Sequence, residues 1–114
     1  MTARTGFVCA VAAVLLLLAG CSTPLPPERA AYAGVWRNGA TMLAISPQGR
    51  VIYRVERGNG FRKSIEAPIQ RFEGDNVVIG LGPISTTFVV SALPKQQPEG
   101  HWTMTVDGVE LTRE

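Results

Sequence analysis

The sequence feature that most constrains the fold is the two-residue turn Asp107-Gly108, which lies between two short alternating segments. Asp-Gly is typical of a hairpin turn in which both central residues have positive φ. The apolar side chains then collect on one face and the threonines on the other, so turn and pattern agree on one register. A hairpin is predicted with three facing pairs: Val106 with Val109, Met104 with Leu111, and Trp102 with Arg113.

A second hairpin is predicted around the segment Ser46–Arg50. A two- or four-residue loop would pair Ile45 with Arg50 or leave Leu43 facing Ile52, so the apolar residues of the two strands would not share a face as the pattern requires. A three-residue loop, Pro47-Gln48-Gly49, instead places Ile45 opposite Val51 and Leu43 opposite Tyr53. Such a loop is a type I turn followed by a left-handed residue, and it favours proline early and glycine third. We therefore expect a bulged hairpin with Pro47 and Gly49 as its turn residues.

The remaining segments are punctuated by Gly, Pro, Asn and Asp. Strands are predicted over 61–70, 77–81 and 84–91, turns over 57–60 and 73–76, and an exposed loop over 92–100. Pro68 marks an edge or a bend, and Gly82-Pro83 is either a tight turn or a kink in one long strand. Residues 34–114 should therefore form an all-β domain, an antiparallel meander of six to eight strands curled into a small barrel or half-open sandwich. A core this small is marginal, so closure or a partner at an exposed edge would help to stabilise it.

Residues 1–20 have the pattern of an export signal, a cleaved N-terminal helix. A short polar start carries Arg4 as its only charge, and an apolar run follows from Phe7 to Ala19. The run is short for a permanent anchor, which needs about 20 apolar residues. An ordinary secretory signal with a coincidental cysteine and an uncleaved short anchor remain alternatives.

The segment Leu18-Ala19-Gly20-Cys21 resembles the lipobox of bacterial lipoproteins, and the chain resembles small envelope lipoproteins. The resemblance implies that Cys21 carries palmitate-type lipid and becomes the mature N-terminus, so that the membrane is one partner. In Gram-negative lipoproteins, Asp after the cysteine favours inner-membrane retention. Ser22 at that position implies delivery to the periplasmic face of the outer membrane.

Residues 21–33 are predicted to be a lipidated, proline-rich linker. Prolines at 24, 26 and 27 favour extended polyproline II, a semi-rigid spacer that would lift the domain off the lipid surface. Residues 29–33 could form one helical turn, but a turn this short is not stable alone.

Gly34-Val35-Trp36 resembles the Gly-x-Trp signature of lipocalins. In that family the Trp plugs one end of a barrel and a late Arg lies across it. The resemblance implies that Trp36 is a structural plug and that Arg113 covers it through a cation–π contact. The chain departs from lipocalins in length, and the other lipocalin motifs are absent.

No catalytic pattern is found, so the chain is not expected to be an enzyme. His101 is the only histidine, expected on the hairpin surface near Glu114, and no serine lies in a nucleophile elbow. One histidine without a free thiolate predicts no zinc site, and no cofactor is expected. Acidic residues interrupt the basic ones at a net charge of +2, which does not suggest nucleic-acid binding.

Two functions remain. The first is a lipid-anchored envelope protein whose β domain binds an envelope protein or a glycan without catalysis. The alternative is a lipocalin-like carrier of a small apolar ligand. Interior volume should discriminate them, and we expect aromatic side chains to fill the barrel: Trp36, Tyr53, Phe61, Phe72, Phe88 and Trp102.

Overall fold

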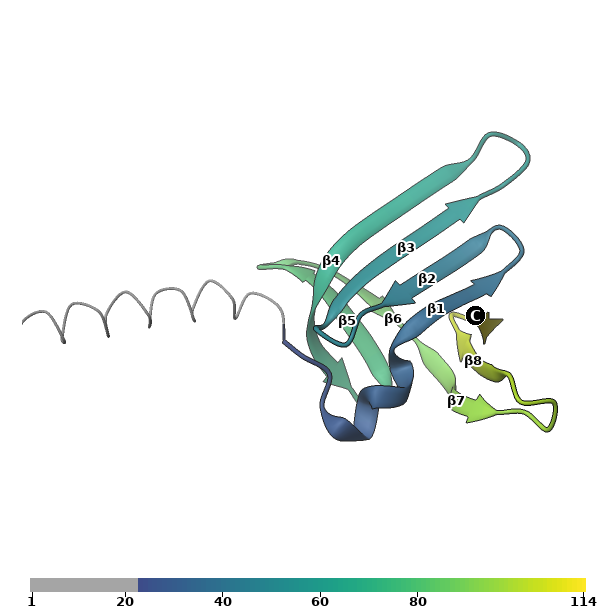
Figure 1. The fold of residues 1–114 in the computed structure, drawn as a ribbon. Helices are drawn as coiled ribbons and strands as arrows, with labels where there is room; N and C mark the ends of the chain where they lie inside the picture. Colours follow the sequence, from purple (N-terminus) through teal and green to yellow (C-terminus); the bar gives the residue numbers. More distant parts are fainter. Residues whose placement is uncertain (1–22) are drawn as a thin grey trace, which may run out of the picture.

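The structure is a computed structural model that describes residues 23–114. The predicted signal, Cys21 and Ser22 lie outside the described residues. The described part is all-β, as predicted, with one short 3-10 helix before the strands (Figure 1). Its elements are η1 Pro27–Tyr32, β1 Gly34–Asn38, β2 Thr41–Ile45, β3 Arg50–Glu56, β4 Arg62–Glu73, β5 Asn76–Leu81, β6 Ile84–Phe88, β7 Val90–Gln96, β8 Trp102–Val106 and β9 Val109–Arg113.

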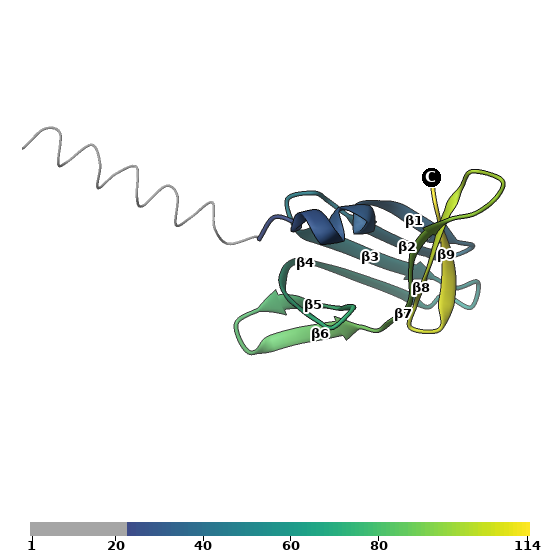
Figure 2. The same cartoon turned by 90° about the horizontal axis from the view of Figure 1, so that it is seen from below.

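Residues 23–114 form nine strands in one antiparallel sheet, in the order β6-β5-β4-β3-β2-β1-β9-β8-β7. The sheet curls into a half-barrel, with β1–β4 on one side and the β5–β6 and β7–β9 parts folded toward it (Figures 1 and 2). The strand number exceeds the predicted six to eight because the predicted strand 84–91 is divided at Val89 into β6 and β7. Strand β7 also continues through residues 92–96, which were predicted to be a loop. Pro94 is tolerated there because the β7–β8 register shifts between Ala92 and Lys95, at an irregularity where a backbone donor is not needed.

Both predicted hairpin registers are confirmed. Across the first, Ile45 faces Val51 and Leu43 faces Tyr53, and Gly49 has a φ of 90°. Across the second, Val106 faces Val109 and Met104 faces Leu111, while Asp107 and Gly108 have φ values of 49° and 78°. Gly82-Pro83 is a tight turn, since Leu81 pairs with Ile84 across it.

Strand β4 shows why Pro68 was a useful marker. Its first half pairs with β3 as far as Pro68, and its second half, from Ile69, pairs with β5. The register shifts between Ile69 and Arg71, so the strand changes partner where the proline lies. The outer edge of residues 62–67 consequently has no paired strand among the described residues.

The two edge strands of the sheet, β6 and β7, are separated in sequence only by Val89. The Asp107 carboxylate accepts a hydrogen bond from the Val89 N–H at 2.8 Å, and the Asp107 N–H donates to the Val89 carbonyl at 2.8 Å. On the other side, the Asn76 Oδ1 accepts from the Val90 N–H at 3.0 Å. Two side chains therefore hold the point at which the sheet edges meet.

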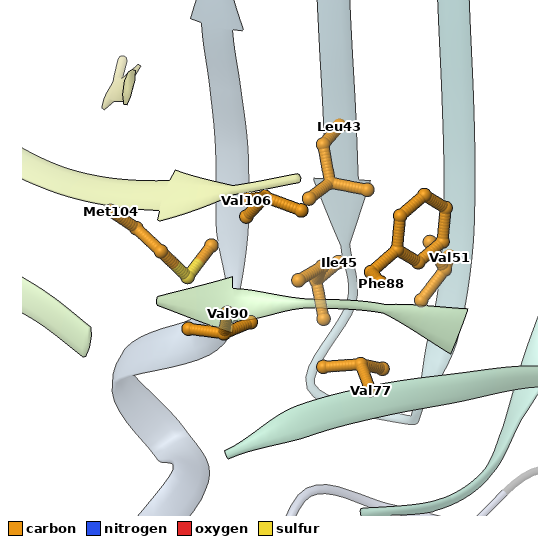
Figure 3. A pocket seen from close by; sticks show the side chains of 8 residues that line it. All are labelled: Leu43, Ile45, Val51, Val77, Phe88, Val90, Met104 and Val106. Atoms are coloured by element: carbon orange, nitrogen blue, oxygen red, sulfur yellow. The ribbon is translucent and has the colours of Figure 1, made fainter. Parts of the chain in front are cut away.

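Side chains from both sides of the half-barrel fill its interior (Figure 3). They are Leu43, Ile45, Val51, Val77, Phe88, Val90, Met104 and Val106, and the cavity between them has a volume of about 0 Å³. The prediction that Phe61 helps to fill the core is wrong. Phe61 is 46% exposed, stacked under the Arg57 guanidinium at 5.2 Å, because it lies in the β3–β4 turn region beyond the core. Tyr32 supplies a buried aromatic ring that the prediction did not include.

Candidate functional site

Trp36 of β1 is a core residue and is 0% exposed. The guanidinium of Arg113 lies 5.4 Å from the Trp36 ring centroid and 4.7 Å from that of Trp102. It also donates hydrogen bonds to the carbonyls of Ala31 and Ala33, at 3.2 and 3.4 Å. The structure thus places the two residues of the predicted plug in contact, and adds Trp102 as a second ring on Arg113.

The 3-10 helix η1 packs beside Trp36 through Tyr32, whose carbonyl accepts a hydrogen bond from the Trp36 Nε1 at 2.9 Å. The Tyr32 ring meets Phe72 edge to face at 5.5 Å, and its hydroxyl donates to the Asp75 carbonyl at 2.9 Å. Burial raises the pKa of the Tyr32 phenol above its ordinary value, against the opposing effect of Arg29. Arg29 bonds the Asp75 carboxylate at 3.0 Å, and this bond is the main cause that raises the pKa of Arg29. Much of the predicted linker is therefore packed against the domain.

The residues before η1 are also fixed to the domain. The Leu25 N–H donates to the Pro47 carbonyl at 3.0 Å, and the Leu25 side chain packs against the core. A Cβ atom at Gly49 would lie 1.9 Å from the Thr23 carbonyl oxygen, so the backbones touch. Gly49 is thus required twice, for its positive φ and for this close approach. We call the end of the domain that holds Thr23 and the loop Ser46–Arg50 the proximal end.

A hollow of about 240 Å³ opens at the other ends of β2 and β3, and we call it the distal mouth. Tyr53 and Arg57 of β3 and its following turn, and Asp107 and Val109 of the β8–β9 hairpin, are among its lining residues. Burial, with the nearby Asp107 carboxylate, raises the pKa of the Tyr53 phenol, while Arg57 lowers it. The mouth therefore offers a neutral hydroxyl and a cation beside apolar surface, which is suited to binding.

The β5–β6 hairpin exposes its apolar end at the proximal end. Leu81 is 68% exposed and Ile84 is 79% exposed, on either side of Gly82-Pro83. We call residues 81–84 the hairpin tip. One hollow of about 380 Å³ has both Thr23 and Leu81 in its lining. A second, of about 240 Å³, lies between the tip and the first half of β4, lined by apolar residues that include Ile65, Ala67 and Ile79.

The polar residues weighed for chemistry do not come together. His101 is exposed, with its Nδ1 3.7 Å from the Glu99 carboxylate, while Glu114 pairs with Arg37. Residues 23–114 contain no group of three His, Cys, Asp or Glu side chains that could hold a metal ion. None of these residues forms a helix long and apolar enough to cross a membrane.

Sequence reasoning did not identify the hairpin tip or the distal mouth as surfaces. The tip has a sequence signal, because residues 77–94 contain no charged side chain. The mouth has none, since its residues come from three separate parts of the chain. No family model, curated protein or solved structure matches this chain.

Proposed function

We propose that this chain is a lipid-anchored protein of the bacterial cell envelope whose β domain binds another envelope component, a protein or a glycan, without catalysis. The anchor is the lipid on Cys21, and Ser22 supports delivery to the periplasmic face of the outer membrane. Two or three acyl chains give stable anchoring, whereas one gives only marginal binding.

The observation that carries the binding role is the filled interior. A carrier needs a cavity of about 300 Å³ or more to bury a small ligand. The eight apolar side chains in Figure 3 leave about 0 Å³ between the two sides of the half-barrel. Binding on the outside therefore fits this domain better than storage of an apolar ligand inside.

The distal mouth is the surface that we assign to the partner. Arg57 lies in it and also stacks on the exposed ring of Phe61, so a cation and an aromatic face are available at its rim. The Tyr53 hydroxyl adds a donor, and Val55 and Val109 add apolar contact. Sugar rings and protein side chains both use such a mixture of ring faces and hydrogen bonds.

The anchor is tested by intact mass and by membrane fractionation of the wild type and Cys21→Ser. The expected wild-type product lacks residues 1–20, carries lipid mass on Cys21 and leaves membranes only with detergent. The serine variant should carry no lipid. A wild-type product without lipid would contradict the anchor.

The binding role is tested with a photocrosslinking amino acid at position 109, in the mouth, and at position 112, which is exposed elsewhere on β9. We expect a discrete adduct from 109 that is reduced by Arg57→Glu, and none from 112. Native mass spectrometry of the purified domain provides the opposing outcome. A small apolar ligand that copurifies stoichiometrically would favour the lipocalin-like carrier instead.

A further inference from the structure

The hairpin tip places large apolar side chains in water at one end of a small domain. Leu81 and Ile84 are the two most exposed of the large hydrophobic residues in the described part of the chain. The turn between them is well formed, since the Gly82 carbonyl accepts a hydrogen bond from the Gln70 Nε2 at 3.0 Å. A defined apolar projection, rather than a scattered residue, marks a contact surface.

The tip lies beside the point where the chain runs toward Cys21. Thr23 and Leu81 line the same hollow, and the turn between β5 and β6 lies at the end of the domain where the coloured chain begins in both views (Figures 1 and 2). Thr23 is two residues after Cys21, and two residues span about 7 Å at most. A lipid on Cys21 therefore brings the tip to within a short distance of the bilayer surface.

The chain after Thr23 cannot act as a spacer. Leu25 is bonded to Pro47, Arg29 to Asp75, and Tyr32 is buried in the core. Only Ser22 lies between the lipid-bearing Cys21 and Thr23, the first described residue. With a lipid on Cys21, this packed segment would hold the domain against the membrane rather than away from it.

The charges closest to the tip do not oppose contact with lipid. Residues 77–94 carry no charged side chain. Glu66, which lines the hollow beside the tip, pairs with Arg50 at 3.3 Å. Arg71, which lines the hollow shared with Thr23, pairs with Glu73 at 3.5 Å. An arginine side chain beside the tip is compatible with the headgroup layer of a membrane.

We propose that the hairpin tip, Leu81–Ile84, lies in the interfacial layer of the membrane that holds the Cys21 lipid. The inference rests on the proposed lipid anchor. The tip and the lipid are then two contacts with one surface, so the domain is oriented as well as tethered. In this orientation the distal mouth faces away from the bilayer, toward the envelope component that it would bind.

The test uses the full lipidated protein in phosphatidylcholine–phosphatidylglycerol vesicles. Signal removal discards Cys9 and lipid occupies Cys21, so one introduced cysteine can carry an environment-sensitive fluorophore. The label is placed by Ile84→Cys, next to the Gly82-Pro83 turn, and in a matched control by Val109→Cys, next to the Asp107-Gly108 turn. Both positions are exposed, so both labelled proteins should fold.

We expect blue-shifted emission and several-fold stronger quenching by shallow nitroxide lipids at position 84 than at position 109. Leu81→Asp should reduce the quenching at 84, because a carboxylate is costly in the interfacial layer. Protein that stays on the vesicles without quenching at 84 would overturn the tip contact and leave the anchor intact. A blue shift without quenching would mean that protein covers the tip, which also overturns it. Failure of the labelled protein to stay on vesicles would instead remove the anchor on which the inference depends.

Discussion

The β5–β6 and β8–β9 hairpins use similar turns and send their side chains to opposite destinations. Gly82-Pro83 has a positive φ of 57° at Gly82, and Asp107-Gly108 has positive φ at both residues. Both are two-residue turns of the kind that matches the twist of a hairpin. Yet Leu81 beside the first turn is 68% exposed, whereas Leu111, on the strand after the second, is 1% exposed.

The difference shows that turn chemistry fixes pairing but not burial. The β8–β9 hairpin returns to the core because Asp107 bonds Val89 and Arg113 bonds the backbone before β1. The tip of the β5–β6 hairpin instead extends beyond the core, and Leu81 and Ile84 stay mostly exposed there. A domain with so small a core would gain from burying Leu81 and Ile84, so their exposure points to a contact outside the domain.

The comparison is tested most strongly by truncating a leucine of the buried hairpin. Leu111→Ala removes a side chain that is packed in the core, and we expect a loss of about 2–5 kcal/mol in the free energy of unfolding. Urea unfolding followed by circular dichroism measures it. A loss below about 1 kcal/mol would mean that β9 is not part of the core.

Arg113→Met should be the next largest change. The substitution keeps apolar volume but removes the two carbonyl hydrogen bonds and the cation over both tryptophan rings. We expect a loss of about 1–3 kcal/mol, measured in the same way. Arg113→Lys should cause a smaller loss than Arg113→Met, because lysine keeps the charge without the planar guanidinium fork. Equal losses for both variants would contradict a role for the fork.

The Asp107 contact with Val89 distinguishes two substitutions in the turn. Asp107→Ala removes the acceptor and disfavours positive φ, so we expect a loss of about 1–2 kcal/mol. Asp107→Asn keeps an acceptor and tolerates the backbone conformation, so its loss should be smaller. Amide hydrogen exchange at Val89 gives a local measurement. Unchanged protection in Asp107→Ala would exclude the contact as a stabilising one.

Alkaline pH should weaken the domain by a smaller amount. Burial raises the pKa values of Tyr32 and Tyr53 above their ordinary 10.0, so the unfolded chain loses these protons first. Their contribution is complete below pH 10.0 and is lost as the pH rises through the folded-state pKa values. Tyr53→Phe should make the decline of the thermal midpoint between pH 9 and about 11 less steep. A decline that is equally steep in Tyr53→Phe would contradict this assignment.

Leu81→Ala should have the smallest effect, within about 0.5 kcal/mol, because the side chain is mostly in water. Set beside Leu111→Ala, it makes the same chemical change in the other hairpin. A loss as large as that of Leu111→Ala would show that the tip folds back onto the domain.

The parts of the fold that could be predicted are those fixed by neighbouring residues. Asp107-Gly108 and Pro47-Gln48-Gly49 set their registers because turn geometry and apolar alternation act over a few residues. Residues 92–96 of β7 were predicted to be a loop because Pro94 is typical of one, and only pairing with β8 makes them part of a strand.

The candidate surfaces could not be predicted from neighbouring residues either, because they are formed by residues far apart in the sequence. The Trp36–Arg113 contact was suggested by a resemblance, not by spacing, since the two residues meet only through β1–β9 pairing. The packing of Tyr32 depends on Phe72 and Asp75, which lie forty or more residues away in the chain. The distal mouth needs three distant segments to be placed before it exists at all.

The pairing of β1 with β9 has a consequence for the order of assembly. Within residues 23–114 every other neighbouring pair of strands in the sheet is also adjacent in sequence, so those pairs can form as the chain lengthens. The edge of β1 that faces β9 stays unpaired until Thr112 and Arg113 arrive. Until then it is a template to which a strand of another chain can add. A chain synthesised or exported from its N-terminus is therefore most vulnerable to aggregation just before its last strand emerges.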